Sequence, residues 1–415
     1  MLKKIAVSQL RLGMHLHALD GAWLDHPFWK SKFVLHDSAE VRKVQESSVR
    51  ECWINTALGL DVLLPLADLP SLQAAAKAPV VARAASSSTG TSAPAKRSLQ
   101  DELSRAAAVC KSGRQAVAAM FQEARMGRSV DTAGCLPLVE EITASVTRNP
   151  GALVSLARLK TIDDYSYMHS LAVCALMVAL GRQLGLDDDA CRRAGLAGLL
   201  HDLGKALMPL DVLNKPGKLT AEEFEIIRRH PAAGFELLEQ GKGVDAEALD
   251  VCLHHHERMD GAGYPHQLVG EQISSWARMA AVCDVYDAIT SNRAYKAGWD
   301  PAESIARMVS WKGHFDPGML NAFVRSLGIY PTGSLVRLES GRLAVVMEQN
   351  AKALISPIVK AFFSTKTKMP INPVLLNLAR PACADRIVAR ESPTEWSFSW
   401  LNELWLPPGI HASSK

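Results

Sequence analysis

Hydrophobic residues recur at helical spacing through the middle of the chain. From Leu99 onward, small and apolar residues repeat every three to four positions, as at Leu103, Ala106 and Cys110, and such segments follow one another to residue 327. Gly, Pro and Asn-Pro sequences separate them. This pattern predicts a succession of helices that makes up most of the fold.

Both ends of the chain have strand-like patterns. Short β-like runs separated by Gly, Asp, Pro and Asn turns occupy the first 70 residues, and near the other end a Glu-Ser-Gly-Arg turn between two apolar runs predicts a β-hairpin. The predicted strands are 3–7, 14–19, 33–35 and 52–54, then 335–338, 343–347, 375–378 and 386–389. The predicted fold class is mainly α, with a small α+β domain before the helices and a short β appendage after them.

Composition divides the chain into five segments. Residues 71–98 are largely Ala, Ser, Thr and Pro, with no large hydrophobic residue after Val81, so they cannot bury enough surface to offset chain entropy, and we expect a flexible linker. The predicted segments are the α+β domain 1–70, the linker 71–98, connecting helices 99–149, a main helical domain 150–327 and a β-containing extension 328–415.

Length, charge and cysteine usage limit the function classes. A chain of 415 residues is too long for one compact core, and its formal net charge of only +3 gives no basic field for a DNA or RNA polymer. No signal-peptide core and no run of ~18 apolar residues is found. The eight cysteines lack CxxC spacing, as expected for small buried residues in a reducing compartment. We therefore predict a cytoplasmic protein without a membrane segment.

Potential metal ligands concentrate in a run of three histidines, His254, His255 and His256, which the carboxylates Glu257 and Asp260 follow. A Gly-Ala-Gly-Tyr-Pro turn comes next. Three histidines can simply decorate an exposed helix end. The two that we favour as ligands, His255 and His256, are predicted to close a helix over 251–257.

A second cluster upstream strengthens the metal hypothesis. His201 ends a stripe of small residues on a helix predicted over 189–203, and Asp202 follows it directly. His230 shares a face of the helix that begins with a capping box at Thr220. Asp284 is the only charged member of another small-residue stripe, where a carboxylate is costly unless it is paired or metal-bound. Together these residues indicate a pair of metal ions that a two-oxygen carboxylate can bridge.

The motifs occur in the order of a known family. The sequences His-Asp-Leu-Gly-Lys at 201–205, His-Pro at 230–231, His-His-Glu-Arg-Met-Asp-Gly-Ala-Gly-Tyr-Pro at 255–265 and Asp-Val-Tyr-Asp at 284–287 resemble the HD-GYP subgroup of the HD hydrolase superfamily. The resemblance covers residues 150–327, and the first 70 residues look like the small domain that commonly precedes such enzymes. It implies an all-helical phosphodiesterase that cleaves cyclic-di-GMP to pGpG, and to GMP after a second cut, with a metal-bridging hydroxide as nucleophile.

The resemblance also implies roles for individual residues. Lys205 would reach the scissile phosphate, and Asp202 would bridge two divalent ions, with iron expected and manganese as the alternative. One ion would be held by His169, His201, Asp202 and Asp284, and the other by His230, His255 and His256. The substrate would be contacted by Gly263, Tyr264, Pro265, Arg293 and Lys296, and the loop supported by Glu257, Asp260 and Asp287.

Three positions refine this assignment. Tyr165 stands where some family members have a Glu that helps to hold a third metal, so we expect two metals. Ala294 replaces a frequent Pro between the two basic residues, which could loosen that segment. His254 is expected not to be a ligand.

Two alternative functions stay open. The chain could hydrolyse another nucleotide, such as a different cyclic dinucleotide, or it could bind cyclic-di-GMP or a partner protein without hydrolysis. The complete ligand set and Lys205 favour hydrolysis. A homodimer or a regulatory protein partner is compatible with the sequence, in which 121–148 is either a dimerisation helix or a packing helix.

Overall fold

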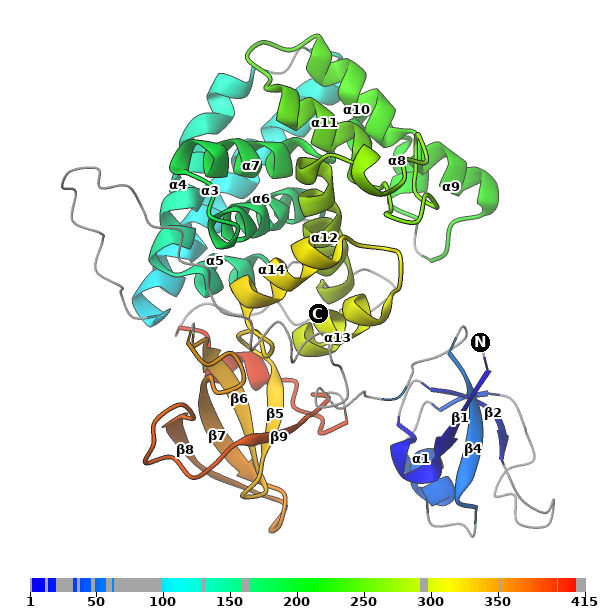
Figure 1. Cartoon of the computed structure of the whole chain (residues 1–415), viewed down its shortest axis with the longest axis vertical. Helices are drawn as coiled ribbons and strands as arrows, with labels where there is room; N and C mark the ends of the chain where they lie inside the picture. The colour runs from blue at the N-terminus through cyan, green and yellow to red at the C-terminus, as the bar shows by residue number, and fades with distance from the viewer. Residues whose placement is uncertain are drawn as a thin grey trace. The chain divides into compact units, whose positions relative to one another are not determined.

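The computed structural model describes most of the chain outside the predicted linker. The described residues are 2–11, 14–19, 33–35, 38–45, 49–56, 62, 99–128, 131–158, 165–215, 217–291, 298–350, 352–393 and 395–407. The linker predicted over 71–98 and the residues Arg293, Ala294 and Lys296 lie outside them. The chain divides into two compact units, Met1–Leu69 with Ala389–Ser399 and Pro70–Val388 with Trp400–Lys415 (Figure 1).

The N-terminal unit contains a four-stranded antiparallel sheet in the order β1-β4-β2-β3. Its elements are β1 (Leu2–Ala6), the 3-10 helix η1 (Val7–Gln9), β2 (His15–Leu19), β3 (Phe33–Val34), α1 (Ser38–Gln45) and β4 (Glu51–Asn55). Ile5, Leu16 and Ile54 of the strands and Val44 of α1 belong to one buried core. The four predicted strands and the α+β class of this part are confirmed.

Helices make up most of the second unit, which confirms the mainly α class. They are α3 (Leu99–Arg125), α4 (Leu136–Arg148), α5 (Pro150–Ala157), α6 (Tyr165–Gln183), α7 (Asp188–Leu200), α8 (Leu210–Leu213), α9 (Ala221–Ile227), α10 (His230–Glu239), α11 (Ala246–His254), α12 (Ser275–Thr290), α13 (Pro301–Ser310) and α14 (Pro317–Leu327). Short 3-10 helices are η4 (Thr132–Cys135), η5 (Leu203–Leu207), η6 (Gly270–Gln272) and η7 (Leu401–Leu404). Among the described residues, we find no helix with the length and apolar character needed to cross a membrane.

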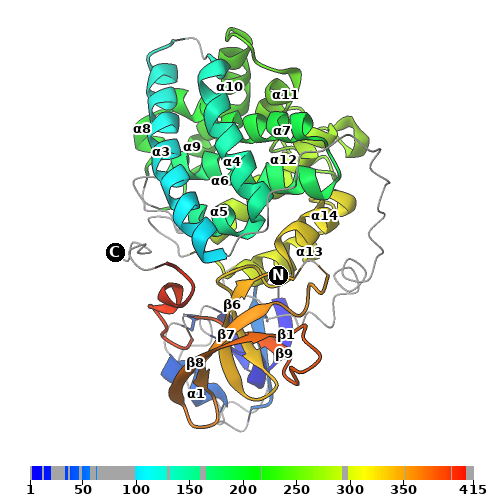
Figure 2. The ribbon, with the colours of Figure 1, turned by 90° about the vertical axis from the view of Figure 1, so that its left-hand side faces the viewer.

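Helix α6 is the centre of this bundle. Residues 168–181 are buried on every side of the helix, as expected for a helix that is apolar all round. It contacts α3, α4, α5, α7, α12 and α14, and Figures 1 and 2 show these helices arranged around it. A residue that points out of α6 therefore lies inside the bundle, which is the position of His169.

Three helix boundaries differ from the predictions. Helix α7 ends at Leu200, and Gly204 belongs to the separate 3-10 helix η5, whereas one helix over 189–203 was expected. Helix α11 ends at His254, before the two histidines expected to close it. His230 begins α10 and does not extend the helix opened at Thr220, because Pro231 lacks an amide hydrogen and is tolerated only in a first helical turn.

The segment 121–148 is not one helix. It contains the end of α3, a turn and η4, and then α4. Helix α4 buries Leu138, Val139, Ile142 and Val146 and contacts α3, α5, α6 and α7. Its apolar face is therefore used for packing inside the unit, which agrees with the second of the two interpretations.

The C-terminal part contains a five-stranded sheet in the order β8-β7-β6-β5-β9. The strands are β5 (Leu335–Leu338), β6 (Arg342–Glu348), β7 (Ile358–Ser364), β8 (Met369–Asn377) and β9 (Ile387–Arg390). The predicted hairpin is confirmed, with Leu335 opposite Val345 and Gly341 in the turn at a φ of 80°. Strand β7 was not predicted, although its buried Val359 and Ala361 alternate with the less buried Lys360.

Glycines bring the helices that carry the predicted ligands unusually close together. A Cβ on Gly198 of α7 would lie 3.0 Å from the carbonyl oxygen of Val173 in α6. A Cβ on Gly204 of η5 would collide with the carbonyl oxygen of His230 and lie 2.6 Å from the nitrogen of Gly234 in α10. Only glycine permits this approach of η5 to α10, and it places His230 beside Asp202.

We expect the substitution Gly204→Ala to destabilise the helical unit by about 3 kcal/mol, the upper part of the range for overpacking, because its Cβ meets backbone atoms that cannot rotate away. Gly134→Ala is the matched control, since no atom lies within 4 Å of its added Cβ. Urea unfolding followed by far-ultraviolet circular dichroism measures both. Equal midpoints for the two variants would show that η5 can move away from α10 at no cost.

Candidate metal centre

Seven predicted ligands converge at the ends and inner faces of five helices. His169 comes from α6, His201 and Asp202 from the end of α7, His230 from the start of α10, His255 and His256 from the residues after α11, and Asp284 from α12. Six of them are at most 5% exposed, and the side chain of His256 is 21% exposed. The structure thus brings all seven residues together at one buried site with a single more open edge.

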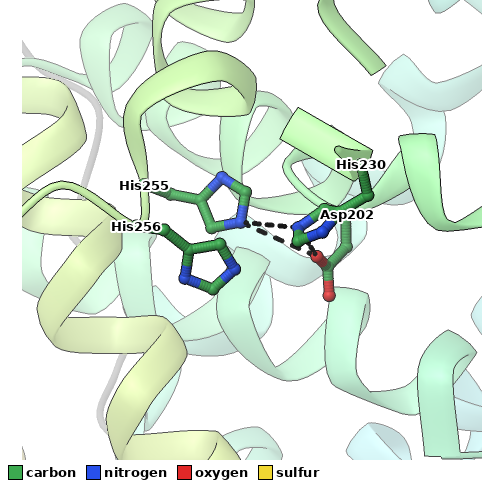
Figure 3. Close-up of side chains that lie close together, drawn as sticks. All are labelled: Asp202, His230, His255 and His256. Carbon is green, nitrogen blue, oxygen red and sulfur yellow. Dashed lines mark hydrogen bonds and ion pairs between the residues drawn. The ribbon is translucent and has the colours of Figure 1, made fainter. Parts of the chain in front are cut away.

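Asp202 lies between two groups of imidazoles. Its Oδ2 atom is 3.3 Å from Nε2 of both His169 and His201. Its Oδ1 atom is 3.2 Å from Nε2 of His230 and 3.7 Å from Nε2 of His255. Figure 3 shows the second group, with His255 beside His256 and facing both His230 and the carboxylate. Each oxygen of Asp202 therefore faces a different potential metal site.

The ligand atoms have spacings that suit a cation. Nitrogen and oxygen atoms of His169, His201 and Asp202 lie within 4.8 Å of one another, and so do those of Asp202, His230, His255 and His256. Asp284 adjoins both groups, with Oδ1 2.9 Å from His169 Nε2 and Oδ2 3.7 Å from His256 Nδ1. A metal ion between such atoms would receive the imidazole and carboxylate ligands that divalent transition metals prefer.

The remaining ring nitrogens orient the histidines. Nδ1 of His201 lies 2.8 Å from the carbonyl oxygen of Gly198, and Nδ1 of His230 lies 2.6 Å from that of Ile227. Nδ1 of His255 lies 3.0 Å from the carbonyl oxygens of both Val251 and Cys252. Because a carbonyl oxygen can only accept, each Nδ1 donates, and each Nε2 presents its lone pair to the site.

Two buried atoms test whether the residues fit a metal. Among the described residues, Nε2 of His201 and Oδ1 of Asp202 have no hydrogen-bond partner, although both are fully buried. A buried polar atom left unpaired costs about 1–3 kcal/mol, so such atoms need another explanation. Each belongs to one of the two groups, and a cation bound in each group would satisfy both. The donor set therefore fits metal ions.

Charge within the site agrees with this fit. Burial opposes ionisation of Asp202, but Lys205 and the neighbouring histidines hold its pKa well below the usual range. Burial lowers the pKa of His230 to about 4, and burial also lowers the pKa of His201. The carboxylate is therefore anionic and these imidazoles neutral near pH 7, which are the forms that bind metals.

His169 differs in this respect from His201 and His230. Burial would lower its pKa, but hydrogen bonds with Asp202, Asp284 and Asp287 raise the pKa to about 10. Its Nδ1 lies 2.6 Å from Oδ2 of Asp287, one turn after Asp284 on α12. Asp287, which we expected to support the loop, thus contacts a potential ligand and orients its ring.

Lys205 lies at the edge of the site. Its ammonium group is 2.5 Å from Oδ2 of Asp202, and its side chain is 20% exposed. The sequence led us to expect a contact with the scissile phosphate, and here the ammonium pairs with the predicted bridging carboxylate.

The loop after the histidines is held by backbone contacts. Glu257 accepts hydrogen bonds from the amides of His266 at 2.6 Å and Leu268 at 3.1 Å. Asp260 accepts from the amide of Ala262 at 3.1 Å and pairs with Arg258. These contacts are of the kind expected for loop support.

The Gly-Tyr-Pro sequence packs directly against the histidines. A Cβ on Gly263 would lie 2.5 Å from Cα of Glu257, so only glycine can occupy this position in the turn. Tyr264 then stacks its ring on His256, with centroids 4.7 Å apart and planes at 29°. The peptide bond between Tyr264 and Pro265 is cis. The loop therefore forms the wall beside the more open edge of the site.

Some predicted residues lie away from the site or outside the described residues. His254 contacts Asp250 at 2.7 Å and His266 at 3.0 Å, and it belongs to neither ligand group found among the described residues. The proposed phosphate ligands Arg293 and Lys296 and the side chain of Tyr165 lie outside the described part.

Sequence reasoning missed two residues beside the loop. Phe224 of α9 and Arg228, the residue that caps the C-terminal end of this helix, both contact the ring of Tyr264. Their spacing of four residues places them on one helix face, which is the signal that could have found them. Nothing in the sequence relates that face to the loop after α11.

Comparisons with known proteins agree with this geometry. Residues 141–319 match the HD domain family, and residues 2–135 match a domain of unknown function, DUF3391. The chain is 54% identical to the cyclic di-GMP phosphodiesterase PA4108 of Pseudomonas aeruginosa over 98% of this chain and 96% of that protein. It is 41% identical to the cyclic di-GMP phosphodiesterase response regulator RpfG of Xanthomonas campestris over 41% of this chain and 47% of that protein.

A relative that is named for another substrate also matches. The 3'3'-cGAMP-specific phosphodiesterase 2 of Vibrio cholerae is 34% identical over 37% of this chain and 30% of that protein. This match covers less of both chains than the match to the Pseudomonas enzyme, which extends over nearly their full lengths. With that match and the HD domain, the chain belongs to the HD-domain cyclic di-GMP phosphodiesterase family.

Proposed function

We propose that the protein hydrolyses cyclic di-GMP to pGpG, and to GMP after a second cut, at the metal centre around Asp202. The observation that carries the proposal is the position of this carboxylate, whose two oxygens face two separate groups of imidazoles. The extensive similarity to a named cyclic di-GMP phosphodiesterase supports the choice of substrate.

We assign two divalent ions to the site. His169, His201, Asp202 and Asp284 would hold one, and His230, His255 and His256 the other, with Asp202 shared. Iron is the metal we propose, with manganese as the alternative, because imidazole and carboxylate ligands suit both. Bound ions of this kind lower the pKa of water and neutralise charge on a phosphoryl group.

The chain's own cationic groups would complete phosphate binding. Lys205 is close enough to the site to contact a phosphate oxygen, in exchange for part of its contact with Asp202. Arg293 and Lys296 are proposed as further phosphate contacts on the basis of the family motif alone. Gly263, Tyr264 and Pro265 would form the substrate-side wall.

The alternative of another cyclic dinucleotide has one observation in its favour, the similarity to a phosphodiesterase named as specific for 3'3'-cGAMP. The alternative of binding without hydrolysis has less support, because every proposed ligand and Lys205 is present and the ligands converge. Incubation of the metal-loaded protein with each dinucleotide separates these functions.

The division into five segments also remains our proposal for the domains. The family match over residues 2–135 extends beyond that boundary into the first connecting helices. A homodimer, a regulatory partner and a location in the cytoplasm stay predictions from the sequence.

Adjacent histidines provide a matched test of the function. We expect iron- or manganese-loaded protein to convert cyclic di-GMP to pGpG, and His255→Ala to lower turnover at least about 100-fold, because the loss of a metal ligand removes several kcal/mol of transition-state stabilisation. His254→Ala should stay within about twofold, since His254 contacts Asp250 and His266 and belongs to neither ligand group among the described residues. Chromatography of the products measures both.

Two results would contradict this proposal. The first is no turnover by the unmodified protein with either metal, under conditions in which a known phosphodiesterase is active. The second is equal turnover by the two histidine variants, which would place the reaction away from the metal centre.

Metal content tests the assignment of ligands without reference to activity. The unmodified protein should hold two ions per chain, Asp284→Asn one, and Asp202→Asn fewer than one, because Asp202 faces both groups of imidazoles. Elemental analysis of protein purified without oxygen gives these numbers. Retention of two ions by Asp202→Asn would refute its bridging role.

A further inference from the structure

Helix α9 lies beside the metal centre but has no buried residue of its own. Its first turn is fixed by a capping box between Thr220 and Glu223, and Lys215 pairs with Glu223 at 2.6 Å. Polar contacts therefore hold the start of this helix, and none of its side chains is fully buried. Phe224, at 47% exposure, is the large aromatic residue on it.

Phe224 and Arg228 extend the wall formed by the loop. The ring of Phe224 meets Tyr264 edge to face, with centroids 6.5 Å apart and planes at 78°. The guanidinium carbon of Arg228 lies 4.9 Å from the centroid of Tyr264 and 6.0 Å from that of Phe224. Since Tyr264 stacks on His256, a continuous series of ring contacts leads from a proposed metal ligand to an exposed aromatic ring.

The exposed groups of this surface, an aromatic ring and a guanidinium group, suit the binding of a purine base. Aromatic side chains stack on nucleobases, and an exposed ring such as Phe224 has area available for that purpose. Tyr264 is already engaged by His256 and Arg228. Arg228 has a partly exposed side chain and a planar fork of donors, which suits the O6 and N7 acceptors of guanine.

The order of groups along the substrate supports the same position. If a phosphate of a cyclic dinucleotide lies at the metal centre, its attached base lies one sugar away. Phe224 is likewise one ring beyond Tyr264, which borders the site. We propose that Phe224 and Arg228 form a guanine subsite, in which Phe224 stacks on the base and Arg228 selects guanine. This inference rests on the proposed hydrolysis of cyclic di-GMP.

The competing explanation is that both residues are ordinary surface residues. Single exposed apolar side chains are common on proteins, and Arg228 also pairs with Glu225 at 2.8 Å. That ion pair involves a carboxylate with 60% exposure, and pairs of this kind contribute little stability. The two explanations predict different kinetics.

The test uses the metal-loaded full chain and steady-state kinetics with cyclic di-GMP. Phe224→Ala should raise KM about tenfold with kcat within about twofold, because a stacking contact made equally in the ground and transition states affects binding alone. Phe224→Trp should restore KM. Leu184→Ala, which truncates a 38% exposed residue just beyond the end of α6, is the matched control and should change neither constant.

Arg228→Lys tests selectivity. It keeps the positive charge but loses the planar fork, so the ratio of kcat/KM for cyclic di-GMP to that for cyclic di-AMP should fall about tenfold. Metal content and the melting temperature should match the unmodified protein in both the Phe224 and Arg228 variants, since neither residue is a proposed ligand or a buried one.

The outcomes separate this inference from the proposed function. If the unmodified protein hydrolyses cyclic di-GMP while Phe224→Ala and Arg228→Lys keep their KM and base preference, the subsite is refuted and the function stands. A fall in kcat at unchanged KM, or a loss of metal, would also refute it. If the unmodified protein does not hydrolyse cyclic di-GMP, the proposed function fails and the guanine subsite fails with it.

Discussion

The position of the Asp202 carboxylate is the constraint on which the helical unit depends. A buried anion is costly unless positive groups surround it, and here Lys205 pairs with one of its oxygens while imidazoles from four separate segments approach both. Those segments can meet only if α6, α7, α10 and the end of α11 pack within a short distance of one another. The small residues at their contacts, Gly198, Gly204 and Gly234, are a consequence of that requirement.

Helix ends contribute backbone carbonyl groups to the site as well as side chains. The last carbonyl groups of a helix have no partner within it. In α7, α9 and α11 such carbonyl groups, from Gly198, Ile227 and Cys252, lie against Nδ1 of the histidine that follows. One contact thereby satisfies a helix end and selects the ring tautomer in which Nε2 faces the site. This explains why these three histidines follow helix ends, whereas His169, inside α6, is oriented by the carboxylate of Asp287.

The sequence predicted the residue types of the site far better than their local geometry. The motif at 201–205 and the histidines near 255 are recognisable because their order along the chain is itself distinctive. Helix boundaries were less predictable, since hydrophobic spacing does not record where a helix stops when the next residues remain apolar, as at Leu203. Strand β7 was missed because its alternation is short and interrupted by paired phenylalanines. The contact of α9 with the loop depends on tertiary packing and has no local signal.

The two sides of the site are built under different constraints. On the side of Asp202, nearly every ligand is buried, so a substitution there changes packing, charge and metal affinity together. On the side of α9, no residue of the helix is buried, and a change at Phe224 would leave the polar contacts that hold the helix intact. Base preference could therefore vary among relatives without disturbing the metal centre.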